Sequence, residues 1–267
     1  MDAITGLDSL TSLAVLVALS TTRIAVAFLL LPIFAQETVP ALVRNAFFVG
    51  LGIVTLVIQP RVSVDGWTLA QWIGVFLKEG FLGLALGLVM AAVLWAFEAA
   101  GQLVDTHAGA TQAQLVDPLS GHQTSLSGAL LGRLANLVFM AAGGFTAWVA
   151  VLLESYAVWP VGQGQVHLPR QAVVMFENRF GDFASTALLL AGPSIVVLFM
   201  VDVALGLANR FAPQLSVLSI SMSVKTLAAM LIWLMVLGGL TEVMQSRIHD
   251  AVRTAIPLVQ KAVSGVR

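Results

Sequence analysis

The chain has 267 residues, of which 58% are hydrophobic and only 10% are charged, and its mean hydropathy is +0.94. Charged residues make up about 25% of an ordinary soluble domain, so this composition excludes that class and indicates an integral membrane protein. The formal net charge is -1, and Lys and Arg occur singly, which excludes a basic surface for nucleic acid. The lack of cysteine excludes disulfides and thiolate metal sites.

The first apolar run extends from Leu10 to Leu31 and is long enough to span a hydrocarbon core about 30 Å thick. Asp2 and Asp8 precede this run, but no Lys or Arg does, so the segment lacks the basic start of a secretory signal. We therefore expect it to remain as the first helix.

Two further apolar runs differ in length. The run from Ala46 to Ile58 is too short for a comfortable span and suggests half of a bent hairpin, whereas Trp67 to Phe97 is long. Gly80, Gly83 and Gly87 in the longer run are spaced three and four residues apart. This spacing predicts a small-residue groove where another helix approaches closely.

The second half of the chain alternates between polar and apolar segments. The segment from Glu98 to Ser127 is too polar and glycine-rich to lie exposed in lipid, and an apolar run from Leu126 to Leu153 follows it. A polar connection from Glu154 to Asp182 leads into the spanning run Ala184 to Ala208. Gly192-Pro193 predicts a kink in that run.

The C-terminal tail, residues 240–267, contains four basic residues and two acidic ones. By the positive-inside rule this balance favours a cytoplasmic C-terminus. A periplasmic N-terminus would require an odd number of crossings, and the short Ala46 run leaves that number open.

A polar break from Asn209 to Leu215 separates the last two apolar runs. Pro213 has no N–H, so in a continuous helix the carbonyl of Asn209 would lose its partner, which costs several kcal/mol in lipid. The amides of Asn209 and Gln214 are able to satisfy freed backbone groups. Two interpretations remain open: an ordinary connection between membrane helices, or a kink buried against partner subunits.

Charged side chains interrupt most of the long apolar runs. One lipid-facing charge costs about 2.5 to 3.5 kcal/mol, so most of these charges must face protein or water. For any single one, a paired or snorkelling side chain is a simpler explanation than a transport site. We expect Lys225 to find its polar partner in another chain, with Asp202 and Glu79 as candidates within this one. The charges concerned are Arg23, Lys78, Glu79, Arg133, Asp202 and Lys225.

Enzyme signatures are absent from the sequence. The four histidines form no H-E-x-x-H pair, and no G-x-S-x-G or Walker sequence is present. Asp105 and Asp117 share a polar segment, but two such carboxylates alone make a weak case for acid–base chemistry. We therefore predict no catalytic, cofactor or metal site.

A set of short motifs is distributed along nearly the whole chain. The motifs are Arg23 with Leu31-Pro32-Ile33-Phe34, Pro40 with Arg44, Lys78-Glu79-Gly80-Phe81-Leu82-Gly83 with Ala85-Leu86-Gly87, Ala100-Gly101, Val116-Asp117-Pro118, and Ala204-Leu205-Gly206-Leu207-Ala208-Asn209-Arg210-Phe211-Ala212-Pro213-Gln214-Leu215. In these motifs the chain resembles the FliR/SctT family, the T or R component of type III secretion and flagellar export gates. Lys225 resembles the injectisome branch, whereas Ser223 departs from the family pattern, which usually has proline there.

The resemblance implies an all-α fold of polytopic membrane-type helical hairpins with kinked, broken helices, built into a multi-subunit helical export gate. It implies a non-enzymatic core subunit in the bacterial inner membrane, forming part of the channel through which unfolded proteins are exported. In the family the assembly is raised relative to the membrane, so hydropathy-predicted spans need not be true crossings. We treat residues 1–267 as one membrane domain with a cytoplasm-facing tail.

The implied partners are the R and S subunits (SctR/FliP-like and SctS/FliQ-like), the U-type switch protein, the V-type export protein, unfolded substrates and membrane lipid. Asn209, Pro213, Gln214 and Lys225 are the expected kink and subunit contacts. No nucleic acid is expected as a partner.

The polar loop carries a further implication. Val116-Asp117-Pro118 matches the segment that plugs the closed channel in the family, which makes Leu115, Val116, Asp117, Pro118 and Leu119 the candidate plug. From the residues alone, a simple connector and a gate both remain open, since most polar loops link spans.

Two other functional classes stay open. A secondary transporter of a small solute would also use broken helices and intramembrane charges, but its halves should show corresponding interruptions, and no convincing repeat is evident. A membrane enzyme is the weakest alternative, because the sequence contains no nucleophile–base or metal constellation.

Overall fold

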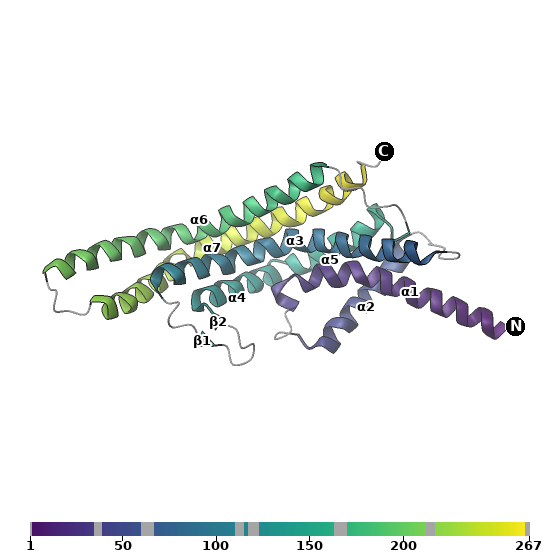
Figure 1. Cartoon of the computed structure of the whole chain (residues 1–267), viewed down its shortest axis with the longest axis horizontal. Coiled ribbons are helices and arrows are strands. Elements are labelled where there is room, and N and C mark those ends of the chain that lie inside the picture. The colour runs from purple at the N-terminus through teal and green to yellow at the C-terminus, as the bar shows by residue number, and fades with distance from the viewer. Residues whose placement is uncertain are drawn as a thin grey trace. The chain divides into compact units, whose positions relative to one another are not determined.

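Helices form nearly all of the described backbone, which confirms the all-α prediction (Figure 1). The computed structural model describes residues 2–34, 39–59, 67–109, 115–116, 123–162, 170–211 and 217–264. Apolar runs of this length fold as helices because a helix pairs its backbone N–H and C=O groups within one segment. In chain order the elements are α1 (Asp2–Leu29), the 3₁₀ helix η1 (Pro32–Phe34), α2 (Ala41–Ile58), α3 (Leu69–Ala108), β1 (Leu115–Val116), β2 (Gln123–Thr124), α4 (Leu126–Ala141), α5 (Gly144–Val158), α6 (Arg170–Phe211) and α7 (Val217–Ser264).

The chain divides into two compact units, and the three longest helices contribute to both. Unit 1 comprises Met1–Ala91, Gly143–Arg179 and His249–Arg267, and unit 2 comprises Ala92–Ala142 and Phe180–Ile248. Each unit is therefore assembled from segments that are distant in the sequence.

In unit 1, α1 and α2 pack against each other as a helical hairpin (Figure 1). The 18 residues of α2 make it long enough to cross a membrane, so the prediction of a short run from Ala46 is wrong. The extra first turn contains Arg44, whose charge hides the helix from a search for apolar runs. The structure buries this side chain, and Arg44 Nη1 donates to the Phe34 carbonyl at 3.2 Å.

Five phenylalanine rings fill the corner between α1, η1, α2 and α5. Their neighbouring centroids lie 5.0 to 6.3 Å apart, a range in which aromatic pairs attract beyond simple burial. The cluster fixes the sharp turn after α1 that Pro32 begins. It consists of Phe28, Phe34, Phe47, Phe48 and Phe145.

The predicted small-residue groove on α3 is correct at two of its three glycines. A Cβ added at Gly83 would lie 2.5 Å from the Arg23 carbonyl oxygen, and one at Gly87 would lie 2.8 Å from Ala27 Cα. A Cβ at Gly80 would meet nothing within 4 Å. The backbones of α1 and α3 thus approach closely at Gly83 and Gly87, and Gly80 lies off this face.

Helix α3 is longer than its apolar run. It continues through the polar residues after Glu98 and ends at Ala108, where Gly109 adopts the left-handed conformation (φ 75°). The predicted polar loop therefore begins about three turns later than its composition suggests. At the other end of α3, Thr68 and Gln71 exchange hydrogen bonds as a capping box.

The predicted single run from Leu126 to Leu153 is wrong, because two helices replace it. Helix α4 ends at Ala141 and α5 begins at Gly144, and the chain bends between them. Gly143 allows this break because its φ of 73° strains any residue with a Cβ.

Helices α6 and α7 also extend beyond their apolar runs. Helix α6 begins at Arg170, inside the predicted polar connection, and α7 continues to Ser264 through most of the predicted tail. Helix α6 contains Pro193 without ending there. The first turns of α6 contain exposed polar residues such as Glu177 and Asp182, which hide these turns from a search for apolar runs.

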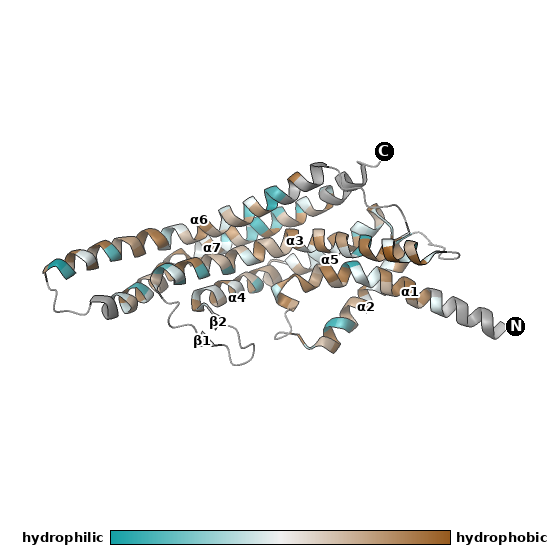
Figure 2. Ribbon diagram, viewed as in Figure 1, coloured by the Kyte–Doolittle hydropathy of each residue, from teal (hydrophilic) through white to brown (hydrophobic). Residues whose placement is uncertain are grey.

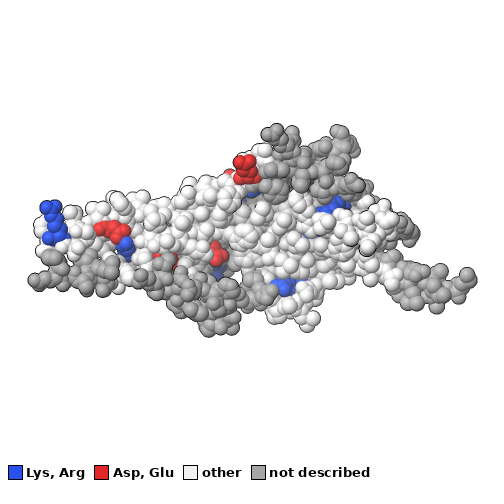
Figure 3. Space-filling view, in the orientation of Figure 1, with Lys and Arg blue, Asp and Glu red and all other residues white. Residues whose placement is uncertain are grey.

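Four described helices are long and apolar enough to cross a membrane: Ala41–Ile58, Leu69–Ala108, Glu177–Phe211 and Ser221–Pro257. The bent pair α4 and α5 adds a fifth if it forms one span, whereas the apolar part of α1, Leu13–Leu29, is shorter than the expected first span. Figure 2 shows that hydrophobic residues dominate these helices, and in Figure 3 charged side chains occupy only small separate patches of the face in view.

The close approach at Gly83 predicts opposite effects for two alanine substitutions on α3. Gly83→Ala places a methyl group against the Arg23 carbonyl, and we expect a loss of about 1 to 3 kcal/mol from overpacking. Gly80→Ala meets open space, and we expect no loss or a gain of up to about 1 kcal/mol from helix propensity. Thermal unfolding of the two detergent-purified variants measures the difference. Equal unfolding midpoints would show that α1 does not approach α3 at Gly83.

Candidate functional site

Three of the charges that interrupt the apolar runs meet inside unit 1. Arg23 lies on α1, Lys78 and Glu79 are adjacent on α3, and their exposed fractions are 0%, 2% and 0%. Arg23 Nε donates to Glu79 Oε2 at 2.8 Å, and Arg23 Nη2 donates to Glu79 Oε1 at 3.1 Å. This bidentate geometry is the strongest form of a guanidinium–carboxylate pair. The structure therefore places these charges among protein atoms.

Arg23 also binds the C-terminal end of α5. Its Nη1 donates to Ser155 Oγ at 3.0 Å, and its Nη2 donates to the Trp159 carbonyl at 2.9 Å. The guanidinium carbon lies 4.0 Å from the centroid of the Tyr156 ring, within the range of a cation–π contact. One side chain from α1 thus joins α3 to α5.

Lys78 completes the arrangement from the other side of Glu79. Its Nζ lies 3.0 Å from Glu79 Oε1 and donates to the carbonyls of Pro160 at 3.1 Å and Val161 at 2.6 Å. Two cations therefore share one carboxylate. The carbonyl oxygens that follow α5 supply the remaining negative potential, because a helix C-terminus carries about half a negative charge.

Neutral side chains extend this network to α2. Gln59, the C-cap of α2, donates through Nε2 to Ser20 Oγ at 3.2 Å and accepts through Oε1 from the Val161 N–H at 3.2 Å. The Tyr156 hydroxyl donates to the Ser20 carbonyl. The buried charge cluster, which we define as Arg23, Lys78 and Glu79 with these partners, thus connects α1, α2, α3 and α5.

The cluster is suited to holding helices together and unsuited to chemistry on a solute. Its charged side chains are at most 2% exposed, so neither water nor substrate reaches them in this chain. Removing one partner of such a pair leaves an uncompensated buried charge, which costs about 3 to 5 kcal/mol.

The remaining intramembrane charges lie in unit 2. Lys225 of α7 forms an ion pair with Asp202 of α6, one of the two partners proposed within the chain, whereas a contact with another chain stays a prediction. The Asp202 side chain is 49% exposed in the single chain, so its predicted burial depends on neighbouring subunits and stays a prediction. Arg133 on α4 is also exposed.

The ion pair fixes how α6 and α7 run together. Asp202 lies nine residues before the end of α6, and Lys225 lies eight residues after the start of α7. Similar distances from the intervening break are what an antiparallel hairpin requires. This arrangement favours a connection between two helices at the polar break. Asn209 lies exposed in the last turn of α6, whereas Pro213 and Gln214 lie outside the described residues.

The candidate plug segment is described in part. Leu115 and Val116 form β1, which pairs antiparallel with β2 through Leu115 with Thr124 and Val116 with Gln123. Asp117, Pro118 and Leu119 lie outside the described residues. The described parts of this segment are therefore extended rather than helical.

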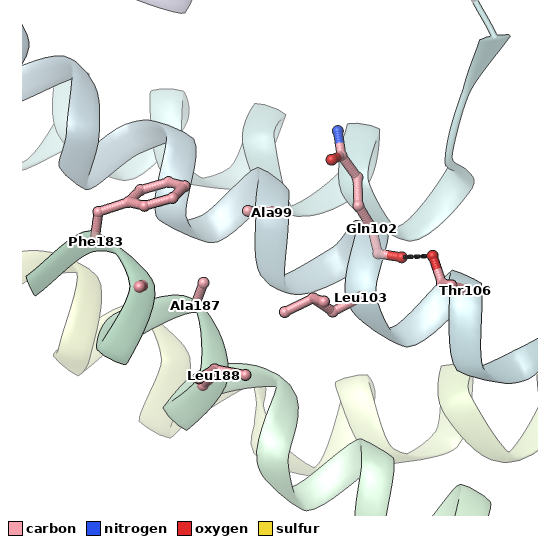
Figure 4. A pocket seen from close by; sticks show the side chains of 8 residues that line it. Ala99, Gln102, Leu103, Thr106, Phe183, Ala187 and Leu188 are labelled. Atoms are coloured by element: carbon pink, nitrogen blue, oxygen red, sulfur yellow. Dashed lines mark hydrogen bonds between the residues drawn. The ribbon is translucent and has the colours of Figure 1, made fainter. Parts of the chain in front are cut away.

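A hollow of about 380 Å³ lies between α3 and α6 in unit 2 (Figure 4). The residues that line it carry no charge, and the Thr106 hydroxyl donates to the Gln102 carbonyl of its own helix at 2.8 Å. Such a surface fits apolar side chains better than a polar solute, which gives no support to the transporter alternative. The lining residues are Ala99, Gln102, Leu103, Thr106, Phe183, Ala184, Ala187 and Leu188.

Among the described residues, no group of three or more His, Cys, Asp or Glu side chains is placed to hold a metal ion.

The sequence analysis did not identify four side chains of the buried charge cluster: Ser20, Gln59, Ser155 and Tyr156. Tyr156 is the single tyrosine of the chain, and its position at the end of an apolar run was a usable signal. The backbone acceptors leave no such signal.

Comparison with known proteins gives one consistent result. Residues 14–251 match the family described as bacterial export proteins, family 1. The chain is 32% identical to the Yop proteins translocation protein T of Yersinia pestis over 90% of this chain and 93% of that protein. It is 32% identical to the surface presentation of antigens protein SpaR of Salmonella typhimurium (82% and 81% covered) and 27% identical to the flagellar biosynthetic protein FliR of Bacillus subtilis (76% and 78%). With its apolar helices, the chain is a multi-pass membrane protein.

The buried charge cluster predicts a large stability difference between two glutamates of unit 1. Glu79→Gln leaves Arg23 and Lys78 without their carboxylate, and we expect a loss of about 3 to 5 kcal/mol. Glu154→Gln removes an exposed carboxylate next to Ser155, and we expect a change within about 0.5 kcal/mol. Chemical unfolding of the detergent-purified variants measures both. A Glu79→Gln protein as stable as Glu154→Gln would contradict the role assigned to the cluster.

The Asp202–Lys225 pair predicts recovery by charge exchange. Asp202→Lys alone and Lys225→Asp alone each place like charges together, whereas the double exchange restores an opposite pair. We expect a favourable coupling energy of about 0.5 to 3 kcal/mol in the double-mutant cycle, measured by thermal unfolding. Strictly additive effects would mean that the two side chains do not interact.

Proposed function

Because the chain belongs to the bacterial export proteins, family 1, we propose that it is a core export-gate subunit of a type III protein secretion system. In this role it forms part of the inner-membrane channel through which unfolded substrate proteins are exported. The observation that carries the proposal is the match of residues 14–251 to one export family, with 32% identity to a translocation protein over 90% of the chain. This match favours the proposal over a secondary transporter.

The injectisome branch is the better-supported one. The two relatives compared at 32% identity are named for translocation and surface presentation, whereas the flagellar relative is 27% identical. Lys225 supports the same choice, since the resemblance associates a lysine near this position with injectisomes.

The subunit contributes structure and surface rather than catalysis. The buried charge cluster makes unit 1 a rigid support, because each charge has a partner outside its own helix. In unit 2, large apolar side chains of α6 and α7 are exposed in the single chain, and partner subunits and lipid are their proposed neighbours. Examples are Phe199 at 67%, Met200 at 64%, Phe211 at 85% and Met235 at 84% exposure.

The proposed neighbours are the R and S subunits (SctR/FliP-like and SctS/FliQ-like) in the gate itself, with the U-type switch protein and the V-type export protein beside it. Asn209, Pro213 and Gln214 contact these subunits at the end of α6. The C-terminus faces the cytoplasm, and the assembly stands in the bacterial inner membrane. The positive balance of residues 240–267 supports this orientation.

The hairpin formed by β1 and β2 carries the proposed channel plug, Leu115 to Leu119. Its support is the family resemblance at Val116-Asp117-Pro118 and a polarity that excludes lipid exposure. Apolar Leu115, Val116 and Leu119 narrow the lumen, and neighbouring glycines allow the segment to move aside. The plug and the subunit role are separate parts of the proposal.

Co-purification tests the subunit role. The tagged chain, expressed with the other export-apparatus proteins of its host, should elute from a size-exclusion column in detergent together with the R and S subunits. A chain that elutes alone, with neither protein bound, would contradict the proposal.

The plug is tested by a deletion. A variant lacking residues 111–125 should still co-elute but let a small dye cross the resting membrane. An assembled deletion complex as tight as the parent would rule out the plug alone.

A further inference from the structure

The first turn of α4 is held by side chains from two places. Ser125, its N-cap, accepts from the Gly128 N–H through Oγ at 2.9 Å. Asp105 of α3 accepts from the Ser127 N–H through Oδ2 at 2.8 Å. Each bond satisfies one of the N–H groups that a helix start leaves unpaired. Ser125 caps its own helix, whereas Asp105 joins α4 to a different one.

Asp105 is well suited to this contact. Asp105 is only 7% exposed, so water competes weakly for hydrogen bonds to its carboxylate. A carboxylate that accepts from a backbone N–H at a helix start forms a charge-assisted bond and also faces the positive end of the helix dipole. The bond therefore holds more strongly than an ordinary neutral contact.

Close backbone packing supports the same junction. A Cβ added at Gly101, one turn before Asp105, would lie 2.4 Å from the Ser127 carbonyl oxygen and 2.5 Å from the Gly128 nitrogen. A Cβ added at Gly128 would lie 2.9 Å from Gln102 Cγ. Helix α3 and the start of α4 are thus in direct contact, with no room for a larger residue on either side.

The C-terminal end of the β1–β2 hairpin is attached directly at this junction. On one side α3 ends at Ala108, less than one turn after Asp105, and Gly109 turns the chain away with a φ of 75°. On the other side Thr124 of β2 directly precedes Ser125, the cap of α4. Whatever holds the start of α4 against α3 therefore also holds the last residue of β2.

We propose that Asp105 is a positioning residue of a clasp, formed by Gly101, Asp105, Ser125, Ser127 and Gly128, that holds the base of the β1–β2 hairpin and thereby keeps the plug in the closed channel. The consequence for the channel rests on the proposed plug function, whereas the clasp itself rests on the contacts of α3 and α4. Opening the Asp105 bond frees α4 to move away from α3 and lets the hairpin leave its position.

The experiment uses the complete gate and exploits the absence of cysteine from this chain. A single Gln123→Cys in β2 reports hairpin exposure through its rate of labelling by a membrane-impermeant maleimide, and dye leakage reports the channel. Asp105→Ala should raise the labelling rate roughly tenfold, the expected effect of losing one charge-assisted hydrogen bond, and should also raise leakage. Asp105→Asn keeps an acceptor oxygen but loses the charge, so both measurements should fall between the parent and Asp105→Ala.

Thr106→Ala is the matched control. Thr106 is the next residue on α3, is exposed, and donates only to the Gln102 carbonyl of its own helix, so both readouts should stay at the parental level. Gly101→Ala is the second test variant, because it pushes α4 away while leaving the Asp105 carboxylate in place. Like Asp105→Ala, it should raise labelling and leakage, and it replaces that variant if the latter fails to assemble.

The outcomes separate the clasp from the plug. Parental labelling in both Asp105→Ala and Gly101→Ala would overturn the clasp, even if deletion of residues 111–125 leaks and the plug stands. Raised labelling without leakage in these variants, together with a tight deletion complex, would support the clasp as the holder of the hairpin and overturn the plug. Equal behaviour of Asp105→Asn and Asp105→Ala would overturn the role given to the acceptor oxygen.

Discussion

Unit 1 depends on burying two cations beside one carboxylate. Such an arrangement is unstable in a low-dielectric interior unless other groups supply negative potential. Here the carbonyls of Trp159, Pro160 and Val161, at the end of α5, supply it. The close approach of α1 to α3 at Gly83 serves the same purpose, because Gly83 lies one turn after Glu79 and faces the carbonyl of Arg23 itself. A bulkier residue there would separate the two charges, so packing and electrostatics form one constraint.

The sequence was sufficient to predict that these charges face protein, and insufficient to identify most of their partners. Burial of Arg23, Lys78 and Glu79 follows from the free-energy cost of a charge in lipid, which does not depend on where the partner lies. The partners of these charges could not be predicted in the same way, because Lys78 binds two backbone carbonyls more than 80 residues away. A carbonyl belongs to every residue and carries no sequence signal. In unit 2, by contrast, Asp202 was one of two candidates for Lys225 within the chain, with Glu79, and the structure pairs Lys225 with Asp202.

The predicted helix boundaries were wrong where a helix contains polar residues or where an apolar run contains a break. Helix α3 extends past Glu98 and α6 begins at Arg170 because polar residues form helices as readily as apolar ones when one face is solvated. At Gly143 the prediction was wrong in the other direction. The sequence shows one unbroken apolar run, but a left-handed glycine divides it into two helices. Family resemblance supplied the plug assignment, and the contact of Asp105 with α4 came from the structure alone.

The cluster also constrains how the protein is made. Arg23 and Glu79 are 56 residues apart, and Arg23 and Ser155 are 132 apart. Ribosomes add about 5 to 20 residues per second, so Arg23 waits roughly 3 to 11 seconds for its carboxylate and longer for α5. A lone arginine released into lipid during that interval would cost about 2.5 to 3.5 kcal/mol. The hydrogen-bond network that buries Arg23 therefore closes only after α5 has been synthesised, 132 residues after Arg23 itself.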